Sequence, residues 1–239
     1  MKALSIHLRV SVLLSLLALP ALACGLGDIF STPPTPGQPA PQSPTVVSSC
    51  KPVTTAQEEA DILFQAQQNE HNQPAISVTI LYQNSSQLIE FVKPDRFRWH
   101  TESGGVWEEV ISISGTAYVG SSSQPFAIAP FMDPTVAAIM KGFTDPPVQQ
   151  SETEMRNQLA QAGLTNIKFN AWLIGYVPDF FGSCVYALTV MSGGSPIYTQ
   201  KTWIGPTDGL RYKFEARDGS GNVTEVRLWD YDPVTIDPP

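Results

Sequence analysis

The chain has 239 residues, of which 14 are Lys or Arg and 22 are Asp or Glu, so its formal net charge at pH 7 is −8. An acidic chain is a poor candidate for binding nucleic acid, which needs clustered basic residues, and it is repelled by anionic lipid surfaces. Hydrophobic residues make up 42% of the chain, close to the share in an ordinary globular protein.

The first 23 residues have the layout of a secretory signal peptide. Lys2 and Arg9 supply a positive start, an uncharged run rich in Leu, Val and Ala follows, and small residues lead to Cys24. The apolar run is shorter than the roughly 20 residues that span a bilayer. The sequence Ala-Leu-Ala-Cys-Gly around Cys24 resembles the lipobox of bacterial lipoproteins, although Ala21 stands where that motif usually has Leu. We therefore expect residues 1–23 to be removed and Cys24 to carry acyl chains such as palmitate. The alternative is an ordinary signal peptide with an incidental cysteine.

The part of the chain after the signal peptide divides into a tether and a domain. Removal of residues 1–23 takes away two basic residues and no acid, so 12 basic and 22 acidic residues remain, a net charge of −10. Residues 24–49 are rich in Pro, Gly, Ser and Thr and lack apolar periodicity, which predicts an extended tether. Residues 50–239 are expected to fold as one domain, extracytoplasmic and anchored to a membrane of the cell envelope through Cys24.

Three cysteines are present in the chain. If Cys24 is lipidated, Cys50 and Cys184 remain as a pair in an oxidising compartment, which favours a disulfide between them. Two free buried thiols are the alternative, because sequence alone does not show the distance between the two residues.

The domain is expected to open with a helix, followed by a run of strands. Thr55 and Glu58 form a capping-box pattern, in which each side chain satisfies a backbone amide of the other, and the helix should end near Pro74. From Ile76 the sequence alternates between apolar and polar residues, as in a half-buried strand. Turn residues then separate strand-like runs, which cover residues 76–82, 87–93, 97–99, 106–113 and 116–120.

Two short helices are expected in the middle of the domain. Asp133 is a good N-cap followed by a first-turn proline, and apolar residues recur after it at helical spacing as far as Phe143. Ser151 and Glu154 form a second capping box, and the helix that begins there should end at Gly163.

A second run of strands follows these helices. The run 185–191 is nearly all apolar, which predicts a strand covered on both faces. In 210–217 the apolar residues at even positions should face one way, and the charged residues at odd positions, beginning with Arg211, should face the other way. Sequential strands with short turns pair antiparallel, so we expect an α+β fold with eight to ten antiparallel strands and helices on one face. The strand-like runs of this part are residues 167–173, 185–191, 197–204, 210–217 and 223–231.

Several of these runs resemble the LolA/LolB lipoprotein-localisation superfamily, which includes LppX/LprG-type lipid carriers. The segment KPDRFRWHTE (residues 93–102) is similar to a strand of that family in which Pro precedes Phe-x-Trp. Residues 106–119 look like its next two strands, and the segment that starts at residues 203–210 looks like its last ones. Ser114 and Gly205 stand where the family usually has Asp. The order of elements also matches over about residues 57–238.

The resemblance implies a strongly curved, unclosed β half-barrel whose concave face is covered by helices, with a cavity that takes acyl chains or other apolar molecules. Lys93 falls where LolA-type proteins often carry a basic residue, so it could hold a polar headgroup; a solvated surface lysine is the alternative. Apolar candidates for the cavity wall have ordinary core packing as their alternative. These candidates are Phe91, Phe97, Trp99, Tyr118, Ile139, Met140, Phe143, Trp172 and Phe214.

No catalytic or metal-binding motif emerges from the sequence, so we expect neither enzymatic activity nor a cofactor or metal. Glu58, Glu59 and Asp61 are expected on the exposed side of the first helix, where they increase solubility. Residues 218–222 faintly resemble a calcium loop but lack its distal Glu, so a hairpin turn is favoured.

Two functions compete at this point. The first is a carrier, a monomer that binds a lipid or other hydrophobic ligand at the cell envelope. The alternative is a surface-anchored protein-interaction or sensor module in which no ligand cavity is used. A packed core without a pocket of several hundred Å³ would favour the second.

Overall fold

The computed structural model describes residues 50–239. The expected signal peptide, the lipidation site Cys24 and the tether of residues 24–49 lie outside the described residues.

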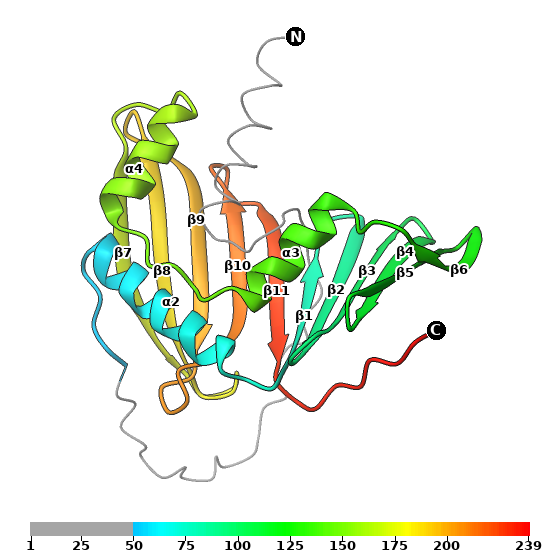
Figure 1. The fold of residues 1–239 in the computed structure, drawn as a ribbon. Helices are drawn as coiled ribbons and strands as arrows, with labels where there is room; N and C mark the ends of the chain where they lie inside the picture. The colour runs from blue at the N-terminus through cyan, green and yellow to red at the C-terminus, as the bar shows by residue number, and fades with distance from the viewer. Residues whose placement is uncertain (1–49) are drawn as a thin grey trace, which may run out of the picture.

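One antiparallel sheet of eleven strands dominates the described part of the chain, in the order β6-β5-β4-β3-β2-β1-β11-β10-β9-β8-β7. Each strand pairs with its neighbours in sequence, except that β6 and β7 do not pair with each other, and β1 also pairs with β11, which joins the two halves of the sheet. The two end strands do not pair with each other, so the sheet curls without closing (Figure 1). The strands are β1 Ala75–Leu81, β2 Ser85–Val92, β3 Arg96–Ser103, β4 Val106–Ile113, β5 Thr116–Ser121, β6 Gln124–Ala129, β7 Lys168–Val177, β8 Ser183–Ser192, β9 Ser195–Ile204, β10 Arg211–Asp218 and β11 Val223–Asp230.

Three helices of the described residues lie on the concave side of the sheet. Helix α2 (Ala56–His71) precedes the sheet in sequence and crosses the half formed by β7–β10. Helices α3 (Pro134–Thr144) and α4 (Glu152–Gln161) belong to the connection between β6 and β7. In Figure 1, α3 lies over the middle of the sheet and α4 over the ends of β7 and β8. The expected fold class, an α+β unclosed half-barrel with helices over the concave face, is confirmed.

The helices begin where the sequence predicts. The hydroxyl of Thr55 accepts a hydrogen bond from the amide of Glu58 at 3.2 Å, and the Glu58 carboxylate accepts one from the amide of Thr55 at 3.0 Å. Ser151 and Glu154 form the same reciprocal pair before α4. The carboxylate of Asp133 accepts from the amide of Thr135 at 2.8 Å at the start of α3. These caps satisfy amides that the first helical turn leaves without partners.

The structure corrects the expected number of strands. The sequence predicts eight to ten, but residues 50–239 form eleven, and the one without a predicted counterpart is β6. This strand lies at the edge of the sheet, contains Pro125 and is mostly exposed, so it lacks the alternation of buried residues that marks an inner strand.

A second correction concerns Arg211. The expected alternation holds further along β10, where Phe214 and Ala216 are buried, whereas Lys213 and Glu215 form an ion pair at 3.3 Å. Arg211 was expected to share the side of Lys213, but it is buried against α2. The pairing of β10 with β9 shifts register between Arg211 and Lys213, and such a bulge breaks the two-residue alternation.

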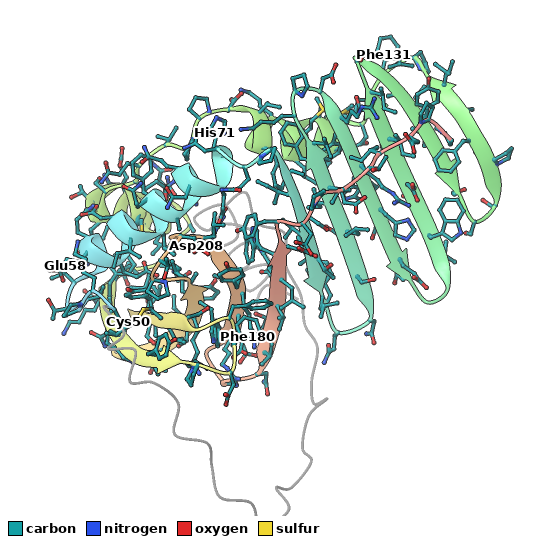
Figure 2. All side chains as sticks on the ribbon, turned by 90° about the horizontal axis from the view of Figure 1, so that it is seen from below. Cys50, Glu58, His71, Phe131, Phe180 and Asp208 are labelled. Atoms are coloured by element: carbon teal, nitrogen blue, oxygen red, sulfur yellow. A yellow bond between two sulfur atoms is a disulfide. The ribbon has the colours of Figure 1, made fainter. Side chains whose placement is uncertain are left out.

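A disulfide joins Cys50 to Cys184, the pairing that the cysteine count favours, with the two Cα atoms 5.6 Å apart. Cys50, labelled in Figure 2, is the first described residue and lies just before α2. Cys184 belongs to β8, which is buried on both faces over most of its length, as predicted. The disulfide therefore attaches the start of the domain directly to an inner strand.

Candidate functional site

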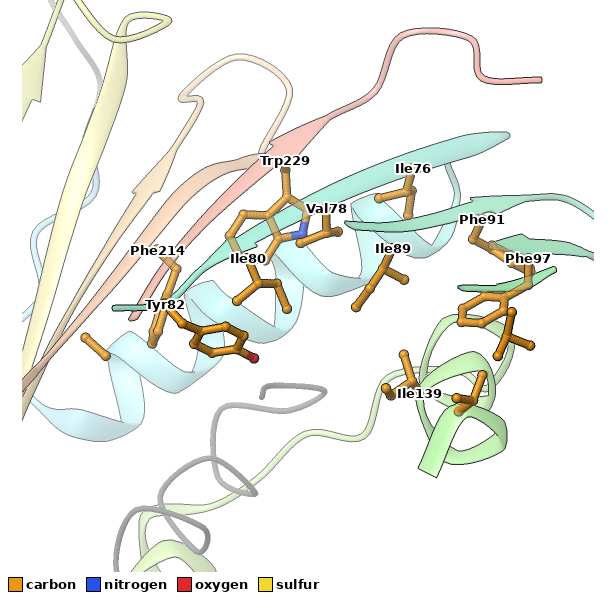
Figure 3. Close-up of a cluster of buried hydrophobic side chains, with 13 residues drawn as sticks. Ile76, Val78, Ile80, Tyr82, Ile89, Phe91, Phe97, Ile139, Phe214 and Trp229 are labelled. Atoms are coloured by element: carbon orange, nitrogen blue, oxygen red, sulfur yellow. The ribbon is translucent and has the colours of Figure 1, made fainter. Parts of the chain in front are cut away.

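A hollow of about 350 Å³ lies between the concave face, α2, α3 and the segment that follows α3. We call it the larger hollow. Its floor is apolar and comes from the middle of the sheet, and Figure 3 shows these side chains projecting from the strands on the side of the helices. Every second residue of β1 contributes, because alternate side chains of a strand point to the same face. The apolar floor residues are Ile76, Val78, Ile80, Ile89 and Trp229, and Arg211 and Arg227 of the same sheet also line the hollow.

The walls of the larger hollow are more polar than its floor. Helix α2 contributes Gln67 and Glu70, and α3 contributes Ala138 and Phe143. Lys141 of α3 forms an ion pair with Asp145, and both residues are well exposed. The larger hollow therefore has an apolar base and a hydrated rim, an arrangement typical of sites for apolar or amphiphilic molecules.

A smaller hollow of about 100 Å³ lies beneath α2, on the half of the sheet formed by β7–β10. Its apolar wall includes Leu63, Phe64, Met155, Phe169 and Leu188. The smaller hollow adjoins the larger one, because the two share four lining residues: Gln67, Val148, Gln150 and Arg211.

Two buried ion pairs lie on the concave face, and sequence reasoning missed both. The guanidinium of Arg211 donates two hydrogen bonds to the carboxylate of Glu70 on α2. Burial lowers the pKa of Arg211, but the charge and the hydrogen bonds of Glu70, with a smaller contribution from Tyr231, together outweigh it, and the pKa is raised above its ordinary value. Arg227 pairs with Glu225 on β11, and burial raises the pKa of Glu225 although the charge of Arg227 opposes the rise. These pairs add no net charge to the hollows.

Glu59 corrects another expectation. It was predicted on the exposed side of α2, but it is 1% exposed and lines the smaller hollow. Its carboxylate accepts a hydrogen bond from the side-chain amide of Gln200 on β9 at 2.9 Å. Burial raises its pKa to about 7, and the bond from Gln200 opposes the rise. By contrast, the exposed carboxylate of Glu58 serves the helix cap, and Asp61 accepts from Gln149 at 2.8 Å.

A signal for the buried glutamates exists in the sequence. Glu59 and Glu70 fall on the same stripe of α2 as the buried Ala56 and Ala66, at spacings of three, seven and four residues. Residues at these spacings share one face of a helix. The apolar members of this stripe are small, so the carboxylates reach past them to partners on the sheet.

Most of the predicted wall residues gather on the concave face. Phe143 lines the larger hollow, and its ring lies 6.1 Å from that of Phe91. Phe214 lines the smaller hollow. The indole nitrogen of Trp99 is buried without a hydrogen-bond partner among the described residues. The others pack in the apolar cluster that joins α3 to β2 and β3, to which Phe97, Trp99, Ile139 and Met140 belong.

Three predicted residues lie elsewhere. Tyr118 pairs with Ile111, which pairs with Arg98, so its side chain lies on the convex face. Trp172 is 40% exposed and follows Ala171, which packs with the cluster under α2, so Trp172 points to the opposite face. The ammonium of Lys93 donates a hydrogen bond to the carbonyl of His71 and thereby holds the end of α2.

Other features of residues 50–239 bear on the site. This part of the chain contains no group of three or more His, Cys, Asp or Glu side chains arranged to hold a metal ion. None of its helices combines the length and the apolar character required to cross a membrane.

Comparison with known proteins gives likenesses of structure. No protein-family model matches the sequence, and no curated protein matches it. Among solved structures, LprF from Mycobacterium bovis matches with 12% identity over 78% of this chain and 99% of its own, at a TM-score of 0.46. The lipoprotein LppX from Mycobacterium tuberculosis matches with 11% identity over 77% of this chain and 100% of its own, at a TM-score of 0.36.

A putative outer membrane lipoprotein-sorting protein domain from Vibrio parahaemolyticus matches with 12% identity over 74% of this chain and 92% of its own, at a TM-score of 0.26. Two of these three proteins are named as a lipoprotein or as a lipoprotein-sorting domain. With such identities and TM-scores the likeness concerns the fold, and the functional argument starts from the two hollows.

Proposed function

We propose that the protein is an envelope lipoprotein that acts as a monomer and binds a lipid or another apolar ligand in the larger hollow. The observation that carries this proposal is the hollow of about 350 Å³ that packing leaves between α2, α3 and the apolar floor of the sheet. Water gains few hydrogen bonds against an apolar floor, so such a hollow favours an apolar guest, and each methylene moved there from water contributes about 0.8 kcal/mol. Cys24 would carry the membrane anchor in this proposal, and no catalytic step is required.

The experiment compares two tryptophan variants of neighbouring residues on α3. Ala138 lines the larger hollow and is exposed toward it, so Ala138→Trp fills the space without displacing a buried side chain. Ala137→Trp is the matched control, because Ala137 does not line the hollow. We expect the full chain to carry a ligand in native mass spectrometry and to take up a fluorescent fatty acid. Ala138→Trp should weaken uptake at least about tenfold, equivalent to about 1.4 kcal/mol, whereas Ala137→Trp should not.

Two results would contradict the proposal. One is a wild-type chain that carries no ligand and takes up no fatty acid. The other is Ala138→Trp uptake equal to that of the wild type, with both variants as stable as the wild type in urea.

The edge strand β7 supports a second candidate function, a protein-interaction module. Its side chains Trp172 and Ile174 are 40% and 48% exposed, and β7 ends the sheet, so its outer backbone groups could pair with a partner strand. Ile174→Lys should abolish capture of an envelope partner in cross-linking experiments while leaving fatty-acid uptake unchanged. Cross-linking that is the same in wild type and Ile174→Lys would exclude this surface.

A further inference from the structure

The smaller hollow contains a set of hydrogen-bonding side chains that the binding of an apolar chain does not use. Gln200 and Thr202 are two residues apart on β9, so both point to the concave face, and Glu59 meets them from α2. Glu59 and Gln200 bond to each other at 2.9 Å. The rest of the lining is mainly apolar, but it also includes Gln67, Gln150, Tyr198 and Arg211.

Thr202 is the unusual member of this set. Its residue is 0% exposed, and its hydroxyl has no hydrogen-bond partner among the described residues. Buried hydroxyls are nearly always paired, and a valine would fill the same space without a polar atom to satisfy. On the opposite face of the same strand, Thr199 is paired with the hydroxyl of Thr189 at 2.9 Å. Among residues 50–239, the hydroxyl of Thr202 therefore keeps a hydrogen-bonding capacity that a ligand in the smaller hollow can use.

The charges around the smaller hollow limit what that partner can be. Arg211 supplies the guanidinium that lines the smaller hollow, and Glu70 already neutralises it, so an anionic group would find no unpaired cation among the described lining residues and would face the carboxyl of Glu59. A hydroxyl group can donate to Glu59 or Gln200 and can donate to or accept from Thr202. A volume of about 100 Å³ exceeds that of one water molecule several times and is suited to a group of glycerol size.

We propose that the smaller hollow binds the uncharged, hydroxyl-bearing headgroup of an amphiphile whose acyl chain lies in the larger hollow, as in an acylglycerol. This inference rests on the proposed function and specifies its ligand class. The four lining residues that the two hollows share place the headgroup site next to the chain site. The pKa of Glu59, about 7, agrees with a carboxyl that is partly neutral near neutral pH and can then donate as well as accept.

A displacement experiment tests the inference with three ligands that carry the same 18-carbon chain. Monooleoylglycerol has two free hydroxyls, methyl oleate has none, and oleylamine carries a cation. Each ligand competes with a bound fluorescent fatty acid on the full chain, its Thr202→Val variant and its Thr199→Val control. On the wild type, monooleoylglycerol should displace the fluorescent fatty acid at about tenfold lower concentration than methyl oleate does. This is the ratio expected from one added buried hydrogen bond.

Thr202→Val should reduce that preference at least about threefold and should not change the concentration of methyl oleate that displaces the fatty acid. Thr199→Val should keep the preference, because the hydroxyl of Thr199 lies outside the hollow. Equal displacement by the two neutral ligands on wild type would overturn the headgroup site while leaving the proposed function standing. A preference for oleylamine that Glu59→Gln abolishes would overturn it in favour of an ionic site. If the fluorescent fatty acid itself does not bind, the proposed function fails.

Discussion

The carboxyl group of Glu59 gives the clearest case of a property set by one side chain. It is buried between α2 and β9, and its pKa is raised from 4.5 to about 7. The folded protein therefore holds the proton of Glu59 more tightly than the unfolded chain does. The contribution of this group to the free energy of unfolding is largest below about pH 4.5, falls as the pH rises, and is lost above about pH 7.

Glu59→Gln should remove this pH dependence, because glutamine keeps the shape and does not titrate. Between pH 4.5 and pH 8 the wild-type free energy of unfolding should fall by on the order of 3 kcal/mol more than that of the variant. Urea unfolding of both proteins at these two pH values measures the difference. Parallel pH profiles for wild type and variant would show that the carboxyl is not buried in solution.

The buried pairs Glu70–Arg211 and Glu225–Arg227 act differently from Glu59, because each carboxylate has a cationic partner. Removing charges from water is costly, and the attraction within a buried pair offsets that cost only when the geometry is good. Such pairs add little net stability, but they penalise any arrangement in which the partners separate. Glu70–Arg211 thus favours one position of α2 on the sheet.

At the scale of elements, α2 is fixed to the sheet at both ends. Near its C-terminus, Glu70 pairs with Arg211 of β10, and Lys93 of the segment after β2 bonds to the carbonyl of His71. Ahead of its N-terminus, the disulfide joins Cys50 to β8. Helix α2 therefore forms a stable wall for both hollows, and α3, which packs through fewer buried residues, forms the less firmly held wall.

Replacing both cysteines by alanine should lower the free energy of unfolding by up to about 5 kcal/mol, because the bond closes a loop with a sequence separation of 134 residues and restricts the unfolded chain. Urea unfolding of the Cys50→Ala, Cys184→Ala variant measures the loss. Wild type reduced with dithiothreitol is the control, since it breaks the bond and keeps both side chains. A loss below about 1 kcal/mol in both cases would contradict the chain-entropy argument.

Local patterns predicted most of the elements, and non-local pairing explains the exceptions. Strand β4 has the predicted bounds, Val106–Ile113, because the turns that limit it and its apolar residues are next to one another in the sequence. Strand β6 was missed because an exposed edge strand has little apolar alternation. The burial of Arg211 depends on a bulge that arises only when β10 pairs with β9, and a single sequence does not show that register.

The candidate site was predicted less completely than the fold. A curved sheet with an apolar concave face follows from alternating strands, so the aromatic residues of β2 and β3 could be placed near the helices. The polar side chains that line the hollows could not be predicted in the same way. Whether a charged stripe such as that of Glu59 is covered depends on which part of the sheet packs against α2, and that is a tertiary property.

For the molecule as a whole, the open sheet makes binding and folding interdependent. The floor of the larger hollow connects the two halves of the sheet through β1 and β11, so a ligand on this floor contacts both halves of the fold. A ligand that binds only the folded protein stabilises it by mass action.

Monooleoylglycerol at about 100 times its dissociation constant should therefore raise the free energy of unfolding by about 2.7 kcal/mol, which corresponds to a rise in Tm of about 5–10 °C for a domain of this size. Thermal unfolding followed by circular dichroism measures the shift. Ala138→Trp is the control and should show a much smaller shift at the same concentration. A wild-type Tm that does not change with ligand would contradict binding to the folded state.

The disulfide at the first described residue also has a mechanical consequence. A pulling force applied through residues N-terminal to Cys50 reaches Cys184 through the sulfur bridge, so the load passes to β8, which is hydrogen-bonded to a strand on either side. The short segment between Cys50 and α2 is then bypassed, and the helix is not unwound from its capped end. If the domain is anchored through the residues before Cys50, a pulling force on that anchor would leave α2, the wall of both hollows, in place.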